Sequence, residues 1–246
     1  MSKFNINGKS ALVSGANRGL GKAIVEQLIE RGASKIYAGS RKVENLTELV
    51  AKYGDKIIPV GLDVTQQASI DQVTSQIDQL DVLINNAGRM SPGTLLSNSA
   101  VDSLKDNLDV NVWGLLRLSN AVRDHFTADN PTAIINIISV AGFANMPSLG
   151  TYSVSKAAVH SVTQGMRGEM ASKNTQVIGV YPGPMDTDMV DGWDLEKVNT
   201  TIVAQNILDG LEAGVDDIFP DNQSHAIGSL YLNDPKRVEA QFAQMV

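Results

Sequence analysis

The chain contains no cysteine, few aromatic residues and no long apolar run, and these absences exclude several classes of protein. Without cysteine there is no disulfide framework, thiol nucleophile, cysteine-based zinc site or iron–sulfur cluster. No apolar stretch approaches the ~18 residues that a membrane-spanning helix requires, and residues 1–9 lack the apolar core of a secretory signal. We therefore expect a cytoplasmic protein that borrows any redox chemistry from an organic cofactor.

Basic residues are also scarce, with 20 Lys and Arg against 27 Asp and Glu, a net charge of −7. Nucleic-acid-binding proteins usually carry a basic surface, so neither nucleic acid nor a membrane is an expected partner. The 246 residues are 43% hydrophobic, which is typical of a soluble globular chain. Because no linker or repeat divides the sequence, we expect one domain over residues 1–246.

Short apolar runs alternate with longer segments of helical period along the chain. The expected strands are residues 11–13, 35–38, 57–60, 82–84, 134–138 and 177–181. The expected helices are residues 19–30, 43–52, 69–79, 100–126, 152–171 and 200–212, with a terminal helix from Asp234. Alternation of this kind predicts an α/β fold, a doubly wound, Rossmann-like parallel sheet with helices on both faces. In such sheets ligands bind beyond the carboxyl ends of the strands.

A glycine-rich turn follows the first expected strand. Gly15, Gly19 and Gly21 give the spacing GxxxGxG, and the next helix begins near Gly19. Glycines there allow the backbone to approach a pyrophosphate, and the helix N-terminus offers amide donors to it. The alternative is a tight strand-to-helix turn that binds no ligand.

The end of the second expected strand indicates which dinucleotide is bound. NAD-binding folds commonly place an acid there for the ribose hydroxyl, but this chain has Ser40 and Arg41. Arg41, with Arg18 from the glycine turn, suits a 2′-phosphate, so NADP(H) is favoured over NAD. The alternative is that Arg41 simply begins a solvent-exposed helix.

Two later strand ends carry polar residues whose roles the sequence leaves open. Asp63 either caps the next segment or accepts a hydrogen bond from the adenine amino group. Residues 85–88 read Asn-Asn-Ala-Gly, and spacing alone favours a structural turn there.

A possible proton-transfer site follows the fifth expected strand. Tyr152 and Lys156 are four residues apart on an expected helix, so they share one face, and Ser139 stands at the strand end. A neighbouring ammonium favours the phenolate, so we expect a lowered pKa for Tyr152, as a general acid/base requires. Taken alone, the pair could equally be surface residues.

The ordered set of motifs resembles the short-chain dehydrogenase/reductase family from about Gly8 to Met189. The matching residues are Gly15, Gly19, Gly21, residues 85–88, Asn111 with Gly114, Ser139, Tyr152, Lys156, and Pro182 with Gly183. Ser14 replaces the threonine of many members. The Gly-rich ending that forms a tetramer interface in many members is missing. The number of subunits is therefore open between a homodimer and a homotetramer. A dimer would form through the expected helices 100–126 and 152–171.

The resemblance implies a catalytic tetrad. Tyr152 would be the general acid/base, Ser139 would orient the substrate, Lys156 would hold the nicotinamide ribose, and Asn111 would hold a water that relays protons. The implied cofactor-binding residues are Gly15, Asn17, Arg18, Gly19, Leu20, Gly21, Ser40, Arg41, Asp63, Val64, Asn86, Ala87, Gly88, Tyr152, Lys156, Pro182, Gly183, Met185 and Thr187.

We therefore predict an NADP(H)-dependent carbonyl reductase or alcohol dehydrogenase. Its substrate site would be walled by apolar residues, namely Ala141, Phe143, Met146, Leu149, Met185, Met189, Val190 and Trp193. This wall favours a hydrophobic ketone, aldehyde or alcohol, although Phe143 and Trp193 could instead pack in the core. The expected lid, residues 186–196, is acidic and would discourage anions. The three histidines have no metal-ligand spacing, and no metal site is expected.

Two other functions remain open at this point. The same fold could serve a non-catalytic NADPH sensor or scaffold. Loss of Tyr152 or Lys156 would have supported that interpretation, and both residues are present. A sugar-nucleotide epimerase or dehydratase shares the Tyr and Lys but usually needs a larger substrate domain.

Overall fold

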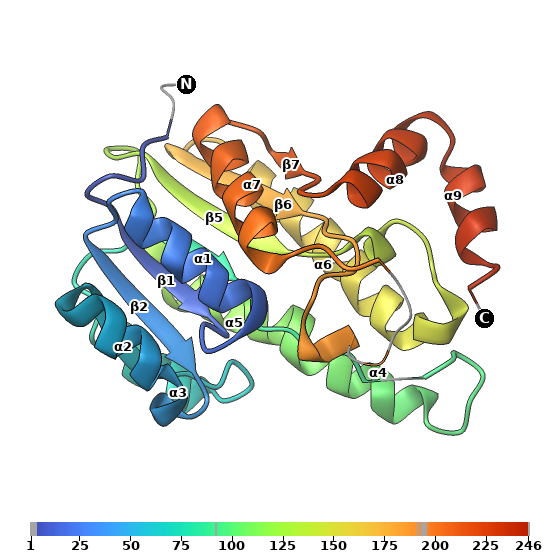
Figure 1. Ribbon diagram of the computed structural model, residues 1–246, viewed down its shortest axis with the longest axis horizontal. Coiled ribbons are helices and arrows are strands. Elements are labelled where there is room, and N and C mark those ends of the chain that lie inside the picture. Colours follow the sequence, from blue (N-terminus) through green and yellow to red (C-terminus); the bar gives the residue numbers. More distant parts are fainter. Residues whose placement is uncertain (1–3, 92, 191, 193–195, 246) are drawn as a thin grey trace.

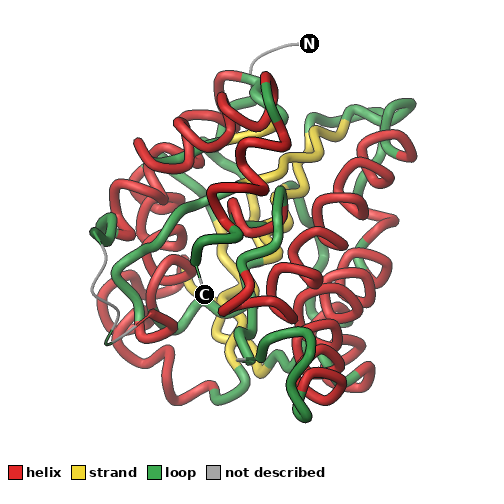
Figure 2. Tube along the Cα trace, turned by 90° about the vertical axis from the view of Figure 1, so that its right-hand side faces the viewer, coloured by secondary structure: helices red, strands yellow, loops and turns green. Residues whose placement is uncertain are grey.

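A single parallel sheet of seven strands forms the centre of the molecule, with helices on both faces (Figures 1 and 2). The computed structural model describes residues 4–91, 93–190, 192 and 196–245. The strand order is β3-β2-β1-β4-β5-β6-β7, and every neighbouring pair is parallel. This confirms the expected doubly wound α/β fold.

The strands are β1 (Ser10–Ser14), β2 (Lys35–Ser40), β3 (Ile57–Gly61), β4 (Val82–Asn85), β5 (Thr132–Ile137), β6 (Thr175–Val180) and β7 (Asp217–Ile218). The helices are α1 (Gly19–Glu30), α2 (Thr47–Tyr53), α3 (Gln67–Thr74), α4 (Ala100–Leu108), α5 (Leu115–Ala121), α6 (Gly150–Glu169), α7 (Thr200–Ala213), α8 (Asn222–Asn233) and α9 (Pro235–Phe242). A π-helical segment, η3 (Asp109–Gly114), joins α4 to α5. In the described part of the chain no helix has the length and hydropathy to cross a bilayer.

Alternate residues of each central strand enter opposite cores, as the two-residue period of a strand requires. Val13 of β1 packs with α1, α2 and α7 on one face, whereas Leu12 packs with α3 and α5 on the other. Both side chains are fully buried. Strands covered on both faces read as continuous apolar runs, which is why their positions could be predicted.

The winding of the sheet reverses between β1 and β4. β1 lies between β2 and β4 in the sheet, so the connections after β1 and after β4 leave in opposite directions. A crevice opens at such a reversal, beyond the carboxyl ends of the two strands. The glycine turn follows β1 at this point.

The expected helix over residues 100–126 ends earlier, at Ala121, and its winding becomes π-helical at η3 while the backbone stays helical from α4 to α5. After α5 only a short 3-10 turn, Arg123–His125, follows. Two tertiary contacts lie at the π-helical segment. The Asn111 side chain bonds the backbone of Arg89, and the Val64 side chain lies where Gly114 has no Cβ.

The C-terminal part adds elements that the sequence did not indicate. β7 has only two residues, and α8 follows it behind a capping box formed by Asp221 and Ser224. The expected terminal helix is present as α9, capped by Asp234. Helices α8 and α9 lie beyond the β7 edge of the sheet (Figure 1).

Candidate active site

The glycine turn after β1 is built for close backbone approach. Gly15 and Gly19 have φ of 68° and 52°, the left-handed region that favours glycine. A Cβ on Gly21 would lie 2.1 Å from the Gly15 carbonyl oxygen. Helix α1 begins without a side-chain cap at Arg18 and without an acid in its first turn. Its first amides therefore suit an external anion such as a pyrophosphate.

Residues Asn86 and Ala87 brace this turn from β4. Both backbone amides donate to the Ser14 hydroxyl at 3.0 Å, and the Asn86 side chain donates to the carbonyls of Ser14 and Gly15. The segment therefore serves as a structural turn. Gly88 follows beside the predicted catalytic residues, since an added Cβ would lie in van der Waals contact with Asn111 Oδ1 at 3.6 Å and the Lys156 ammonium at 3.9 Å.

The three predicted catalytic side chains occupy the end of β5 and the first turns of α6. The Ser139 hydroxyl accepts from the Ala141 amide at 3.2 Å and donates to the Pro182 carbonyl at 3.4 Å. Lys156 Nζ donates to the Ile137 carbonyl at 2.9 Å and lies 5.6 Å from the centre of the Tyr152 ring. Tyr152 and Lys156 are 9% and 5% exposed. The structure thus brings these groups together at the predicted strand end.

The expected net lowering of the Tyr152 pKa is wrong in this structure. Burial raises the pKa of the Tyr152 phenol to about 12, and the Ser139 hydroxyl opposes this only in part. Burial also lowers the pKa of Lys156 to about 8. Removal of water disfavours the charged form of both groups, and the ammonium bonds a backbone carbonyl.

Asn111 lies in η3, and its side chain is held on three sides. Oδ1 accepts from the Arg89 amide at 2.8 Å, and Nδ2 donates to the Arg89 carbonyl and the Ser155 hydroxyl, both at 2.9 Å. Neither Arg89 nor Ser155 was identified from the sequence. A π-helical turn often marks a functional site. The role of Asn111 in holding a water stays a prediction.

The arginines that were predicted to choose the cofactor are exposed at the same edge. Arg41 directly follows Ser40, which is buried at the end of β2. Arg18 forms an ion pair with Asp188, a partner that the sequence did not reveal because 170 residues separate the two. Both side chains of the pair are largely exposed.

Asp63 and Val64 have clear structural roles. Asp63 Oδ1 accepts from the amide and hydroxyl of Thr65 at 3.0 and 2.8 Å, which closes a local turn before α3, whose own N-cap, Gln66, makes no side-chain cap bond. Val64 is 7% exposed and packs in the core shared with α3 and α5. Their predicted position beside an adenine stays a prediction.

The segment after β6 lies against the glycine turn. A Cβ on Gly19 would lie 3.1 Å from the Thr187 methyl group, and the Gly183 amide donates to Asp221 at 2.9 Å. Met185 bridges to Val198 and packs against the core below α1 and α7. The predicted Trp193 wall, and Asp191 and Asp194 of the predicted lid, lie outside the described residues.

Phe143 packs in an aromatic cluster, the alternative that the sequence left open. Its ring stacks on Tyr181 and Tyr231 with centroid distances of 4.6 and 4.4 Å. In the same cluster His160 Nδ1 lies 2.8 Å from the Tyr181 hydroxyl. Among the described residues no group of acidic and histidine side chains could hold a metal ion.

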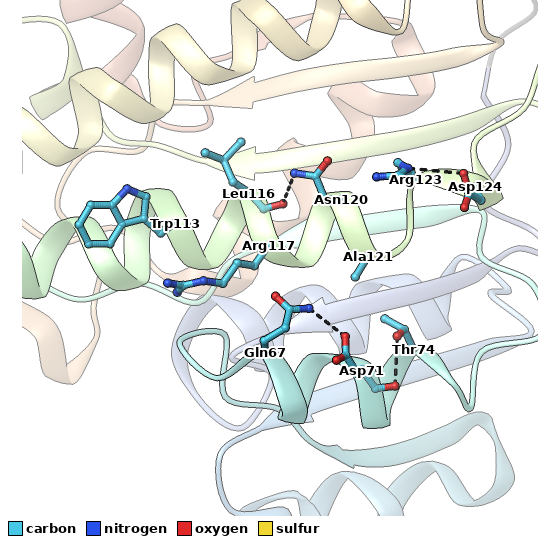
Figure 3. A pocket seen from close by; sticks show the side chains of 10 residues that line it. All are labelled: Gln67, Asp71, Thr74, Trp113, Leu116, Arg117, Asn120, Ala121, Arg123 and Asp124. Carbon is cyan, nitrogen blue, oxygen red and sulfur yellow. Dashed lines mark hydrogen bonds and ion pairs between the residues drawn. The ribbon is translucent and has the colours of Figure 1, made fainter.

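The strand ends define the site, and a separate hollow lies elsewhere on the molecule. A cavity of about 780 Å³ lies between α3 and α5, lined by residues such as Asp71, Trp113 and Arg117 (Figure 3). None of the predicted catalytic or cofactor-binding residues lines it. The glycine turn and the uncapped α1 instead fit a dinucleotide across the β1/β4 crevice.

Known proteins with the same sequence pattern and fold are oxidoreductases. The model of the short chain dehydrogenase family matches residues 9–197. An uncharacterized oxidoreductase from Staphylococcus epidermidis is 31% identical over 207 residues, 82% of this chain and 89% of that protein. A short-chain dehydrogenase from Burkholderia cenocepacia, solved in complex with NADP, is 33% identical with a TM-score of 0.87, covering 98% of this chain and 99% of that one.

A second solved structure shows the fold alone. A short-chain dehydrogenase/reductase from Burkholderia phymatum, solved with NAD, is 22% identical with a TM-score of 0.84, covering 95% of this chain and 96% of that one. Relatives with either nicotinamide cofactor therefore share this architecture. The family match spans the glycine turn, the π-helical Asn111 and the Ser139, Tyr152 and Lys156 cluster. On this sequence and this fold, the chain is an oxidoreductase that belongs to the short-chain dehydrogenase/reductase family.

Proposed function

We propose that this protein is an NADP(H)-dependent oxidoreductase that interconverts an apolar ketone or aldehyde with its alcohol. The observation that carries the proposal is the meeting of Ser139, Tyr152 and Lys156 beyond the end of β5, one strand from the β1/β4 crevice. A phenol and a hydroxyl at one place can both bond a single carbonyl oxygen.

The chain's own residues would bind and orient the cofactor. The amides at the start of α1 and the Thr187 hydroxyl would bind the pyrophosphate, and Lys156 would bond the nicotinamide ribose. Asn86, whose side chain bonds the carbonyls of the glycine turn, would position a ribose of the cofactor. The bound cofactor supplies the chemistry of hydride transfer to or from the substrate carbon.

Proton transfer would then be the task of Tyr152. In reduction the phenol donates its proton to the oxygen of the carbonyl group as that oxygen gains negative charge, and in oxidation the phenolate takes the proton back. Ser139 would bond the same oxygen and hold it in line. The charge of Lys156 would favour the phenolate that remains.

Arg18 and Arg41 support the choice of NADP(H). Both are exposed at the edge where a 2′-phosphate would lie, and no acid stands at the end of β2 to bond a free ribose hydroxyl. The relative from Burkholderia cenocepacia was solved with NADP. An Arg41→Asp variant is expected to lose NADPH affinity and gain preference for NADH.

The test is the loss of NADPH absorbance with a panel of hydrophobic ketones, aldehydes and diketones, with NADH in parallel. Turnover that prefers NADPH supports the proposal. Tyr152→Phe is expected to lower turnover by about 10²- to 10⁴-fold while NADPH still binds. An active Tyr152→Phe enzyme would overturn the mechanism, and tight NADPH binding without any turnover would favour a sensor.

A further inference from the structure

Two asparagines, one at the end of α4 and one four residues later in η3, hold the segment that follows β4. Asn111 Oδ1 and Nδ2 bond the amide and the carbonyl of Arg89, at 2.8 and 2.9 Å. Asn107 makes the same pair of bonds to Ser91, at 2.8 Å to its amide and 3.1 Å to its carbonyl. Each side-chain amide thus pairs with the backbone of one residue, and the two residues face one side of the segment.

The other N–H group of each asparagine reaches helix α6. Asn111 Nδ2 donates to the Ser155 hydroxyl at 2.9 Å. Asn107 Nδ2 donates in the same way to the Thr151 hydroxyl at 3.1 Å. Thr151 and Ser155 are again four residues apart, and each directly precedes one member of the predicted proton-transfer pair. The arrangement at Asn111 is therefore repeated one helical turn earlier, at residues that were not identified from the sequence.

The first turn of α6, which carries Tyr152, lacks a cap of its own. The helix follows Leu149 with no side-chain cap and has no acid in its first turn. The first amides of a helix have no partner within the helix, so such a turn depends on outside contacts. Thr151 supplies two of them. Its amide donates to the Gly93 carbonyl at 3.2 Å, and its hydroxyl donates to the Ser91 carbonyl at 3.3 Å.

We refer to Asn107, Ser91 and Thr151 as the second clamp, and its polar groups are shielded from solvent. Asn107 and Thr151 are 0% exposed, and Ser91 is 8% exposed. The Asn107 side chain uses its oxygen and both of its N–H groups within the protein. Because water does not replace a lost partner in so closed a place, removing one group leaves the others unpaired and lets the turn shift.

We propose that Asn107 is a positioning residue for Tyr152 and acts through Thr151. The second clamp holds the first turn of α6 so that the Tyr152 hydroxyl meets the carbonyl oxygen that Ser139 bonds. This inference rests on the proposed function. A displacement of about 1 Å at a reacting group can cost on the order of 10²-fold in rate, so the clamp acts on kcat and not on cofactor binding.

The test removes the Thr151 hydroxyl and keeps a side chain of similar size. Thr151→Val leaves the Asn107 N–H and the Ser91 carbonyl with one partner fewer, whereas Thr151→Ser keeps the hydroxyl and loses only a methyl group. The matched control is Thr163→Val, farther along the same helix. Thr163 is also fully buried, and its hydroxyl also accepts from an asparagine, Asn136 Nδ2, at 3.0 Å.

We expect Thr151→Val to lower kcat about 10- to 100-fold, with KM and the Kd of NADPH changed by less than about twofold. The substrate is the carbonyl compound with the highest wild-type kcat in the panel of ketones, aldehydes and diketones. Because proton donation then limits turnover, the ratio of kcat in water to kcat in heavy water is expected to rise. Thr151→Ser is expected to retain most of the wild-type kcat.

The control separates positioning from a loss of stability. Thr163→Val and Thr151→Val are both expected to lower the melting temperature, by about 2–8 °C, because each leaves a buried asparagine N–H unpaired. In Thr163→Val kcat and the water to heavy-water ratio are expected to stay at the wild-type values. A purely structural role of Thr151 would give the same kcat in the two variants.

A double variant tests whether Asn107 acts through Thr151. Asn107→Ala is expected to lower kcat as Thr151→Val does. Combining the two substitutions is expected to lower kcat no further than the larger single loss, because both break the same contact. Losses that multiply in the double variant would overturn the assignment of Asn107. If Asn107→Ala does not fold, the Thr151 variants still test the clamp.

The outcomes separate this inference from the proposed function. Wild-type turnover with an unchanged kcat in Thr151→Val would overturn the inference alone, as would an equal loss of kcat in Thr163→Val or in Thr151→Ser. Absence of wild-type turnover on every carbonyl compound would overturn the proposed function and this inference with it.

Discussion

Burial controls the ionisation of the two side chains that would exchange protons with the substrate. With a pKa of about 12, Tyr152 keeps its proton at neutral pH and is suited to act as an acid in reduction. Lys156, with a pKa of about 8, loses its charge above that pH. The charge favours phenolate formation, so its loss slows proton donation.

The kcat/KM for reduction is therefore expected to be constant near neutral pH and to decline above about pH 8. The kcat/KM for oxidation is expected to rise with pH, because the phenolate becomes accessible. The measurement is kcat/KM for both directions across pH. In Lys156→Arg, whose guanidinium stays charged, the decline in reduction should move to higher pH. A reduction rate that climbs through pH 8 would contradict this assignment.

Arg18 has a partner in the protein that a 2′-phosphate would have to replace. Asp188 reaches it from the segment whose Thr187 contacts Gly19, so the ion pair spans the glycine turn and the segment after β6. Because both side chains are about 70% exposed, the pair is weak. Asp188→Asn is expected to tighten NADPH binding about two- to fivefold and to leave NADH binding unchanged.

Fluorescence titration with each cofactor measures the effect. Asp186→Asn is the control, because it removes the same charge from an exposed neighbour in the same segment. An equal gain for NADPH and NADH in Asp188→Asn would mean that the carboxylate does not compete with the 2′-phosphate.

Among the elements, α1 depends on one glycine for its position over the sheet. A Cβ at Gly21 would lie 2.1 Å from the Gly15 carbonyl oxygen and 2.5 Å from Asn86 Nδ2, so Gly21→Ala must displace the helix or the turn. We expect a loss of about 1–3 kcal/mol in the free energy of unfolding, with weakened NADPH binding.

Gly165→Ala in α6 is the matched control, because an added Cβ there meets nothing within 4 Å. It is expected to stabilise the protein by about 0.5–1 kcal/mol, since alanine favours the helix interior. Urea denaturation measures both variants. Equal effects at the two positions would show that close packing at Gly21 is unimportant.

The elements that the sequence predicted well are those whose local pattern agrees with their burial. Helix α1 has the predicted bounds, and six strands were located because both of their faces are covered. The π-helical winding at η3 coincides with Asn111 bonding Arg89, 22 residues away, and no local pattern records that contact. The two residues of β7 are too few to show a period.

The candidate site shows the same division. The order of the glycine turn, Ser139, Tyr152 and Lys156 was readable from spacing and resemblance, because helix and strand geometry fix their directions. The directions of the pKa shifts could not be predicted from the sequence, because they depend on how completely the fold buries Tyr152 and Lys156. The Arg18 and Asp188 pair also required the fold.

At the scale of the whole molecule, the C-terminal helices share a core with the catalytic elements. Val238 of α9 and Ile227 of α8 pack with Val140 and with Val159 of α6. Such sharing is what one cooperative domain requires. The expectation of a single domain over the chain stays a prediction.

The row formed by α4, η3 and α5 lies beside α6 and carries apolar groups on its outer side. Val101 is 65% exposed and Trp113 is 45% exposed, and Figure 3 shows Trp113 on the turn that precedes α5. Large exposed apolar groups are typical of surfaces that bind a partner. We propose that a second copy of the chain covers this face in a homodimer.

Light scattering is expected to give twice the chain mass of 26.3 kDa, and Val101→Glu with Trp113→Glu is expected to give a monomer. Leu232→Glu is the control, because Leu232 is 78% exposed on α8, at the other end of the chain. Two carboxylates buried in each half of an interface lack partners and repel one another, whereas one on an open surface stays hydrated. If Leu232→Glu dissociates the protein and the double variant does not, the copies meet through the C-terminal helices and the assignment of the interface to α4, η3 and α5 is wrong.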